Sequence, residues 1–260
     1  MKALKLSMLA AVMLCGITLV KAQDANEIMG KHVAAIGGLD NWNKLTSMKA
    51  TGTFSQGGMD ISIAQSLIIG KAMRMDISVM GMNGFQIVTN KDGWMYMPFM
   101  GGAKLDTMKP EMLKAYQKQL DVKTSQKLDY KADGTKLEYA GKDTVNKMPC
   151  FKVKLTDKEG NESTVYVDCN TYYILRAESK VKQDDQEQEV AVLYDNYKKL
   201  DGGVVMPMSV NAGGVDITFK TIEVNTPIDE SIFVPAIPKD KPADTKTQAE
   251  PQKANSSSNK

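Results

Sequence analysis

Alternation of apolar and polar residues with a period of two dominates the chain from Ser47 to residue 222. In a strand this period places alternate side chains on opposite faces, and the runs are separated by the Gly, Asn and Asp turn signals typical of all-β proteins. Strands do not alternate regularly with helices, so the predicted sheet is antiparallel. We predict strands over eleven segments, the last broken at Gly213-Gly214: 47–56, 59–69, 72–80, 84–90, 93–98, 135–141, 149–156, 163–169, 172–182, 188–198 and 204–222.

A short amphipathic helix is predicted before the first strand. Asp24 as N-cap and Glu27 resemble a capping box, and Gly37-Gly38 supplies the stop signal. A second helical turn is expected around 41–45. The sequence therefore places helical structure at the start of an otherwise β domain.

One further helix, predicted from Met108 to Asp121, interrupts the strands. Thr107 is its expected N-cap, and Pro110 suits its first turn. A lone helix between strands has to cover apolar surface. We therefore expect its apolar stripe to face the sheet, and that stripe consists of Met112, Tyr116 and Leu120.

Residues 1–22 have the pattern of a cleavable secretory signal peptide. Lys2 and Lys5 precede an apolar stretch that ends at Val20, and Ala22 is the predicted last residue before cleavage. The apolar stretch is shorter than the ~20 residues that a membrane-spanning helix needs. We therefore expect an exported protein that begins at Gln23.

Cleavage would remove Cys15 and three lysines, which changes the net charge from +2 to −1. At the other end, residues 239–260 contain no aromatic or branched aliphatic residue, so we expect a disordered Lys/Pro/Ser-rich tail. One domain, residues 23–238, is predicted between these two ends.

The sequence argues against several classes of function. Lysine and arginine do not cluster in a stripe, so no nucleic-acid partner is expected. His32 is the only histidine and no nucleophile motif accompanies it, so we expect it to be exposed or packed against its helix. One histidine is too few for a histidine-ligated zinc site. No Gly-rich phosphate-binding loop follows a predicted strand. We expect neither an enzyme nor a cofactor.

An acidic cluster is expected at a solvated hairpin tip, and it comprises Asp184, Asp185, Glu187 and Glu189.

Methionine is the most unusual feature of the composition, with 18 residues, ten of them between Met59 and Met112. Residues at i and i+2 share a face of a strand, so a Met-x-Met pair presents two thioethers on one side. Three interpretations remain open: core packing, a deformable apolar surface for variable ligands, and a Cu(I) site. The four pairs are Met73/Met75, Met80/Met82, Met95/Met97 and Met206/Met208.

Cys150 and Cys169 lie on the two arms of one predicted hairpin. A three-residue loop with Gly160 in the left-handed region would set Cys150 opposite Asp168, one residue out of line with Cys169. A two-residue loop would align the cysteines but mix apolar and polar faces. A disulfide between Cys150 and Cys169 is therefore left open.

Four stretches, in this order and spacing, resemble the periplasmic outer-membrane lipoprotein carrier (LolA-like) superfamily. They span nearly the whole predicted domain. The stretches are 32–38 (HVAAIGG) with Trp42 and Lys44, 92–99 (DGWMYMPF), 201–207 (DGGVVMP), and 225–233 (NTPIDESIF) with Pro235.

This resemblance implies an open half-barrel of about eleven antiparallel strands, with helices on its concave side and an apolar interior that receives acyl chains. The implied function is a periplasmic carrier of lipid or lipoprotein, with membrane-associated donor and acceptor proteins as partners. Two alternatives are a cell-envelope accessory module that binds another protein and a Cu(I)-binding protein. The residues that we predict to line the apolar pocket are Met73, Met75, Met80, Met82, Phe85, Ile87, Trp94, Tyr96 and Phe99, with Met112, Tyr116 and Leu120 on the covering helix.

Overall fold

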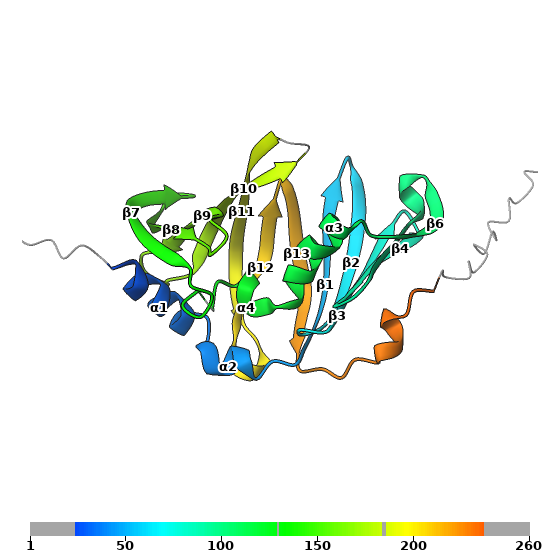
Figure 1. Ribbon diagram of the computed structural model, residues 1–260, viewed down its shortest axis with the longest axis horizontal. Helices are drawn as coiled ribbons and strands as arrows, with labels where there is room; N and C mark the ends of the chain where they lie inside the picture. The colour runs from blue at the N-terminus through cyan, green and yellow to red at the C-terminus, as the bar shows by residue number, and fades with distance from the viewer. Residues whose placement is uncertain (1–23, 129, 184–185, 237–260) are drawn as a thin grey trace, which may run out of the picture.

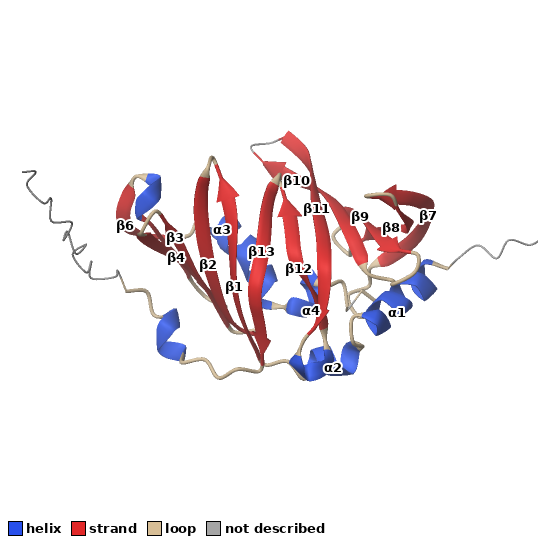
Figure 2. Cartoon of the chain, turned by 180° about the vertical axis from the view of Figure 1, so that it is seen from behind, coloured by secondary structure: helices blue, strands red, loops and turns tan. Residues whose placement is uncertain are grey.

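The computed structural model describes residues 24–128, 130–183 and 186–236 (Figure 1). In this part of the chain thirteen strands form one antiparallel sheet, in the order β6-β5-β4-β3-β2-β1-β13-β12-β11-β10-β9-β8-β7. The sheet is open, with β6 and β7 at its two edges, which confirms the predicted mainly β, half-barrel class (Figure 2). The strands are β1 Ser47–Gln56, β2 Met59–Ile68, β3 Ala72–Val79, β4 Met82–Thr89, β5 Gly93–Met97, β6 Gly102–Thr107, β7 Lys136–Val145, β8 Met148–Thr156, β9 Glu162–Asp168, β10 Ile174–Gln183, β11 Gln186–Lys199, β12 Val205–Ala212 and β13 Val215–Val224.

Each predicted strand segment forms a strand, and the last segment is two strands that meet at Gly213-Gly214. Both glycines have positive φ angles of 59° and 80°, as a two-residue hairpin loop requires. The sequence missed β6, because Leu105 is the only large apolar residue in this six-residue strand. The count of about eleven strands was therefore too low.

The predicted first helix is confirmed as α1, Ala25–Ala35, and Asp24 caps it by accepting a hydrogen bond from the backbone N–H of Asn26 at 2.9 Å. The expected second helical turn is α2. The bounds of the other helical elements in the described residues are α2 Leu39–Asn43, η1 Pro98–Met100, α3 Pro110–Gln117, η2 Lys118–Leu120, α4 Val122–Ser125, η3 Asp201–Gly203 and η4 Glu230–Phe233.

The prediction of a single helix from Met108 to Asp121 was wrong. Thr107 ends β6, the N–H of Met108 donates to Gly93 O at 2.8 Å, and Lys109 is the N-cap of α3. After α3 the chain continues as η2 and then turns at Asp121, which has extended backbone angles, before α4 begins. Because the chain still pairs with β5 up to Met108, the helix begins later than predicted. The extended backbone at Asp121 separates η2 from α4.

α3 and α4 lie across the inner, concave face of the sheet, and α1 and α2 lie along its lower end in the view of Figure 1 (Figures 1 and 2). Two apolar clusters fill the space beneath them: one centred on β1–β5, β12 and β13, and one on β8–β10 under α1. Val33 contacts both clusters, so the inner core is continuous. On the outer face η4 packs on β3–β5. The predicted signal peptide and tail lie outside the described residues.

Candidate functional site

The inner face of β1–β4 is built from rows of residues that the strand registers place side by side. The row next to the β2–β3 turn is fully apolar, and the row next to the hairpin tips is apolar again. Residues in one row point to the same side, because directly paired residues of antiparallel strands share a face. From the turn to the tips the rows are Met48/Leu67/Met73/Val88, Ala50/Gln65/Met75/Gln86, Gly52/Ile63/Ile77/Gly84 and Phe54/Ile61/Val79/Met82.

Residues 108–128, here called the cover segment, lie over the first of these rows. Met108, Leu120 and Val122 are buried in the same cluster as Met73 and Val88. Leu113 and Tyr116 of α3 pack against this cluster, whereas α3 itself contains no buried residue. The cover segment therefore closes the apolar face with buried residues on both sides of α3, whereas the residues of α3 itself are half-buried or exposed.

Besides the bond from the Met108 N–H to Gly93 O, three hydrogen bonds attach the cover segment to the sheet. The Gln117 side-chain amide donates to Thr89 O at 3.0 Å, and the N–H of Gly70 donates to Leu120 O at 2.8 Å. The Gln86 amide reaches the Tyr116 hydroxyl at 3.5 Å, the longest of the three. These bonds hold the end of the segment near the β2–β3 and β4–β5 turns.

The other half of the inner face is covered by α1. Ile28 and Met29 are fully buried against Phe151, Val153 and Val165 of β8 and β9. His32 was expected to be either exposed or packed against its helix, and it is buried. Its Nδ1 lies 2.9 Å from Tyr172 O. A carbonyl oxygen only accepts, so Nδ1 carries the hydrogen and the neutral ring leaves Nε2 as an acceptor.

A small cavity of about 30 Å³ adjoins His32, Lys127, Tyr194 and Tyr197. His32 is buried there, and the backbones of Tyr172 and Gln126 oppose the effect of burial on its pKa. Burial lowers the pKa of His32 below its ordinary value and lowers the pKa of Lys127, while burial raises the pKa of Tyr194. This cavity is large enough for about one water molecule, and is too small for an acyl chain.

A larger cleft, of about 690 Å³, opens between the cover segment and the β8–β9 hairpin. Its lining is rich in charges of both signs, including Lys118, Lys127, Asp157 and Glu159. Lys118 Nζ and Glu159 Oε2 are 3.9 Å apart across it. A polar cleft of mixed charge is a poor site for an apolar ligand, so the apolar part of the inner face is the stronger candidate.

The structure brings together one part of the predicted pocket. Met73 and Met75 lie on the inner face, Leu120 is buried above them, and Tyr116 is half-buried beside them. Phe99 also lies on this side, because a Cβ placed on Gly84 would be 2.7 Å from Phe99 Cε1. Met80 and Met82 are exposed at the β3–β4 tip.

Met112 does not face the sheet as expected. It is exposed, and Leu113 takes the inward position. The stripe that faces the sheet consists of Leu113, Tyr116 and Leu120. Their spacing of i, i+3 and i+7 is typical of one helix face and can be read from the sequence. Sequence analysis thus missed Leu113 by choosing the i, i+4 partner of Tyr116.

Four predicted pocket residues lie on the opposite face. Their strand positions are offset by one from the inner-face methionines, so the period of two turns them outward. They form a cluster beneath η4 and its Phe233, and they are Phe85, Ile87, Trp94 and Tyr96. These four positions were wrong for an inner wall.

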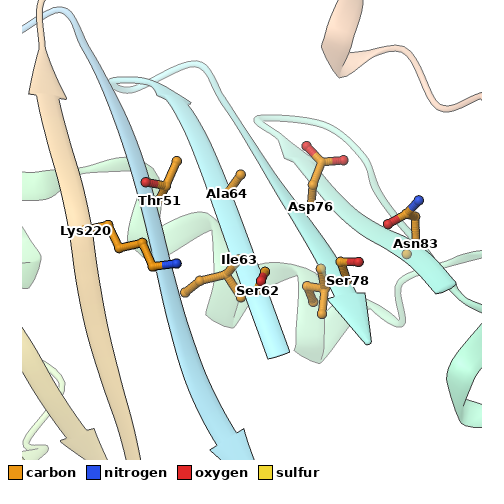
Figure 3. Close-up of a pocket in the computed structure, with 11 residues that line it drawn as sticks. Thr51, Ser62, Ile63, Ala64, Asp76, Ser78, Asn83 and Lys220 are labelled. Carbon is orange, nitrogen blue, oxygen red and sulfur yellow. The ribbon is translucent and has the colours of Figure 1, made fainter. Parts of the chain in front are cut away.

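The outer face carries a trough of about 520 Å³ across β13 and β1–β4 (Figure 3). Thr51, Ser62, Asp76 and Asn83 line it together with Lys220 (Figure 3). Asp76 already pairs with Arg74, whose guanidinium lies 2.7 Å from its Oδ1. Its lining also includes Ile63, Ala64 and Ile77. The charged groups of Asp76 and Lys220 make the trough a weaker candidate for an acyl chain than the apolar rows of the inner face.

The predicted register around the cysteines is confirmed. Cys150 pairs with Asp168, and the Gly160 φ of 85° matches the three-residue loop. Both thiols are free, with Cys150 in an outer-face cluster and Cys169 packed against the inner-face cluster. Pairing them would require a one-residue slip of β8 against β9.

The Met-x-Met pairs differ in their surroundings. Met73 and Met75 share the inner face, and Met73 Sδ accepts a hydrogen bond from Gln65 at 2.8 Å. Met80 lies in a turn with φ of 49°, so Met80 and Met82 are not a pair within one strand. Among the described residues there is no group of three or more His, Cys, Asp or Glu side chains that could hold a metal ion.

The described part also contains no helix long and apolar enough to cross a membrane.

Comparison with known proteins bears on the fold. The sequence matches no protein-family model and no curated protein. The structure is similar to a DUF1329 family protein from Desulfovibrio piger, with a TM-score of 0.53 and 14% identity over 80% of this chain and 96% of that one. It is also similar to a LolA superfamily protein from Nitrosomonas europaea, with a TM-score of 0.50 and 10% identity over 82% of this chain and 99% of that one. The chain therefore has a LolA-like fold.

Proposed function

We propose that the protein is a periplasmic carrier that holds an acyl chain of a lipid or lipoprotein between the inner face of β1–β5 and the cover segment. The observation that carries this proposal is the cover itself. An inner face with Met73 in a fully apolar row and Met75 in the next row is closed by a segment whose helix α3 has no buried residue. Such a cover can be displaced while the sheet stays intact.

The driving force would be transfer of the acyl chain out of water, worth ~0.8 kcal/mol for each buried CH₂ group. The thioethers of Met73 and Met75 suit chains of different shape, because methionine has three rotatable side-chain bonds and a polarizable sulfur. Tyr116 and Leu120 would contact the ligand from above. This role needs no catalytic group, and it is compatible with export after cleavage at Ala22 and with membrane-associated donor and acceptor proteins.

The test is uptake of a fluorescent fatty acid by the purified protein, together with organic extraction and mass spectrometry of co-purifying lipid. Met75→Asp places a charge on the inner floor and should weaken uptake at least about tenfold. Ser78→Asp is the matched control, because Ser78 is also a half-buried residue of β3 but faces outward.

Equal uptake by Met75→Asp and Ser78→Asp would show that the ligand does not bind at the inner face. Absence of both co-purifying lipid and uptake by the wild type would overturn the proposal and favour an accessory module with a filled core. Circular dichroism of both variants checks that each is folded.

A further inference from the structure

We infer that three uncharged hairpin tips at one end of the sheet form a surface that docks the protein on a lipid bilayer. The tips join β1 to β2, β3 to β4 and β5 to β6, and in an antiparallel sheet alternate connections lie at the same end. The tips of β1 and β2 lie at the upper edge of the view in Figure 1. Here they are called the methionine tips: residues 54–59 (FSQGGM), 79–84 (VMGMNG) and 97–103 (MPFMGGA).

Each methionine tip presents a methionine to solvent. Met80 is 77% exposed and Met100 is 79% exposed, and Met59 and Met82 are also exposed. None of the tip residues carries a charge, although 25% of the chain is charged. Clustered exposed apolar residues without charges mark a contact surface for an apolar partner.

The conformation of Met80 strengthens this inference. Its φ of 49° lies in the left-handed region, where Asn, Asp or Gly is favoured in a two-residue hairpin loop. A Cβ there is strained, and the side chain gains nothing by packing because it is almost fully exposed. A long apolar side chain at this position is unfavourable for the isolated protein, and becomes favourable only in contact with an apolar phase.

The β7–β8 hairpin provides a comparison within the molecule. Val145-Asn146-Lys147-Met148 has the same two-residue loop as Val79-Met80-Gly81-Met82, with positive φ at both loop residues. Its loop residues are polar and charged, and strand order puts it at the other end of the sheet. The turn geometry therefore does not require methionine.

A bilayer is the occupant that these features favour over a protein partner. The exposed methionines lie on three different hairpin tips, and these tips lack the charged side chains with which a protein partner is commonly recognised, so they suit the apolar phase of a bilayer. The apolar row Phe54/Ile61/Val79/Met82 begins directly below two of the tips. Docking there would bring the open edge of the inner face to the membrane surface.

The experiment is sedimentation of the purified protein with phosphatidylcholine vesicles. We expect the wild type to bind, with little dependence on salt because the tips hold no charge. The double substitution Met80→Asn/Gly81→Lys gives the β3–β4 tip the loop of β7–β8 and should lower vesicle partitioning at least about tenfold. Met148→Ser is the matched control and should bind like the wild type, because Met148 and Met82 are both 44% exposed.

A reporter at the tip gives a second measurement. Fluorescence of Met80→Trp should be quenched by phosphatidylcholine with brominated acyl chains, whereas the added fluorescence of Met148→Trp should not be. Failure of the wild type to bind vesicles, or equal binding by the loop-exchange variant, would overturn the inference. Self-association of the wild type that the loop exchange abolishes would assign the tips to a second copy of the chain instead. Acyl-chain uptake is measured without vesicles, so it can fail or succeed independently.

Discussion

The two halves of the inner face are covered in different ways. Over β8–β10, α1 buries Ile28 and Met29 completely, and its His32 is held by the carbonyl of Tyr172. Over β1–β5, α3 buries none of its residues, and hydrogen bonds of Tyr116 and Gln117 attach it to β4. The first cover is a helix with fully buried residues of its own, whereas the second is held mainly by the buried residues that flank α3.

The hairpin tips at the same end of the sheet divide in the same way. The β8–β9 tip reads Asp157-Lys158-Glu159-Gly160-Asn161 and is highly charged, whereas the methionine tips carry no charge. Charged tips keep one half solvated, and uncharged tips suit contact with an apolar phase. Cover and tips therefore favour the β1–β6 half as the place of the proposed ligand exchange.

The largest expected difference between the halves is in stability. Ile28→Ala should lower the free energy of unfolding by about 2–5 kcal/mol, because it creates a cavity in a fully packed core. Leu113→Ala in α3 should cost less than about 2 kcal/mol, because Leu113 is half-buried and α3 can shift. Urea unfolding measures both values. Equal losses would show that the two covers are equally tight.

His32 should give the β8–β10 half a pH dependence. Burial lowers its pKa in the folded protein, so the unfolded chain binds the proton more readily. Stability should therefore be complete above the unfolded pKa of about 6.5 and be lost as the pH falls below it, by up to about 1.4 kcal/mol for each pH unit.

The measurement is the free energy of unfolding between neutral and mildly acidic pH, with His32→Gln as the comparison. The variant should flatten the slope in this window. An unchanged slope would mean that His32 is as accessible to protons in the folded protein as in the unfolded one.

The smallest effect is expected at the cysteines. Cys150 is fully buried, and burial raises the pKa of its thiol to about 11. Cys169 is half-buried, so it should react first with a thiol reagent in the folded protein. Reduction should leave the melting temperature unchanged. Mass spectrometry that finds a Cys150–Cys169 disulfide would instead require a shifted β8–β9 register.

Strand positions were predictable because they depend on local alternation, as the agreement over β1–β5 and β7–β13 demonstrates. The register of β8 and β9 was predictable as well, since loop length and one apolar face decide it together. Local sequence was insufficient at β6 and at the start of α3, where pairing with β5 decides the backbone. Met73 and Met75 were grouped by alternation and share the inner face, whereas Phe85 and Trp94 were added for their apolar character alone and lie on the outer face.

The sequence by itself determined an antiparallel β domain, its hairpins and the two alternating sets of side chains, because these follow from the period of two and from turn chemistry. Only the tertiary structure decided which set became the inner face. The positions of α1, the cover segment and η4 settle this, and each is placed by contacts with residues far away in the sequence. Met73 faces the cover segment, and Phe85 lies beneath η4, for this reason alone.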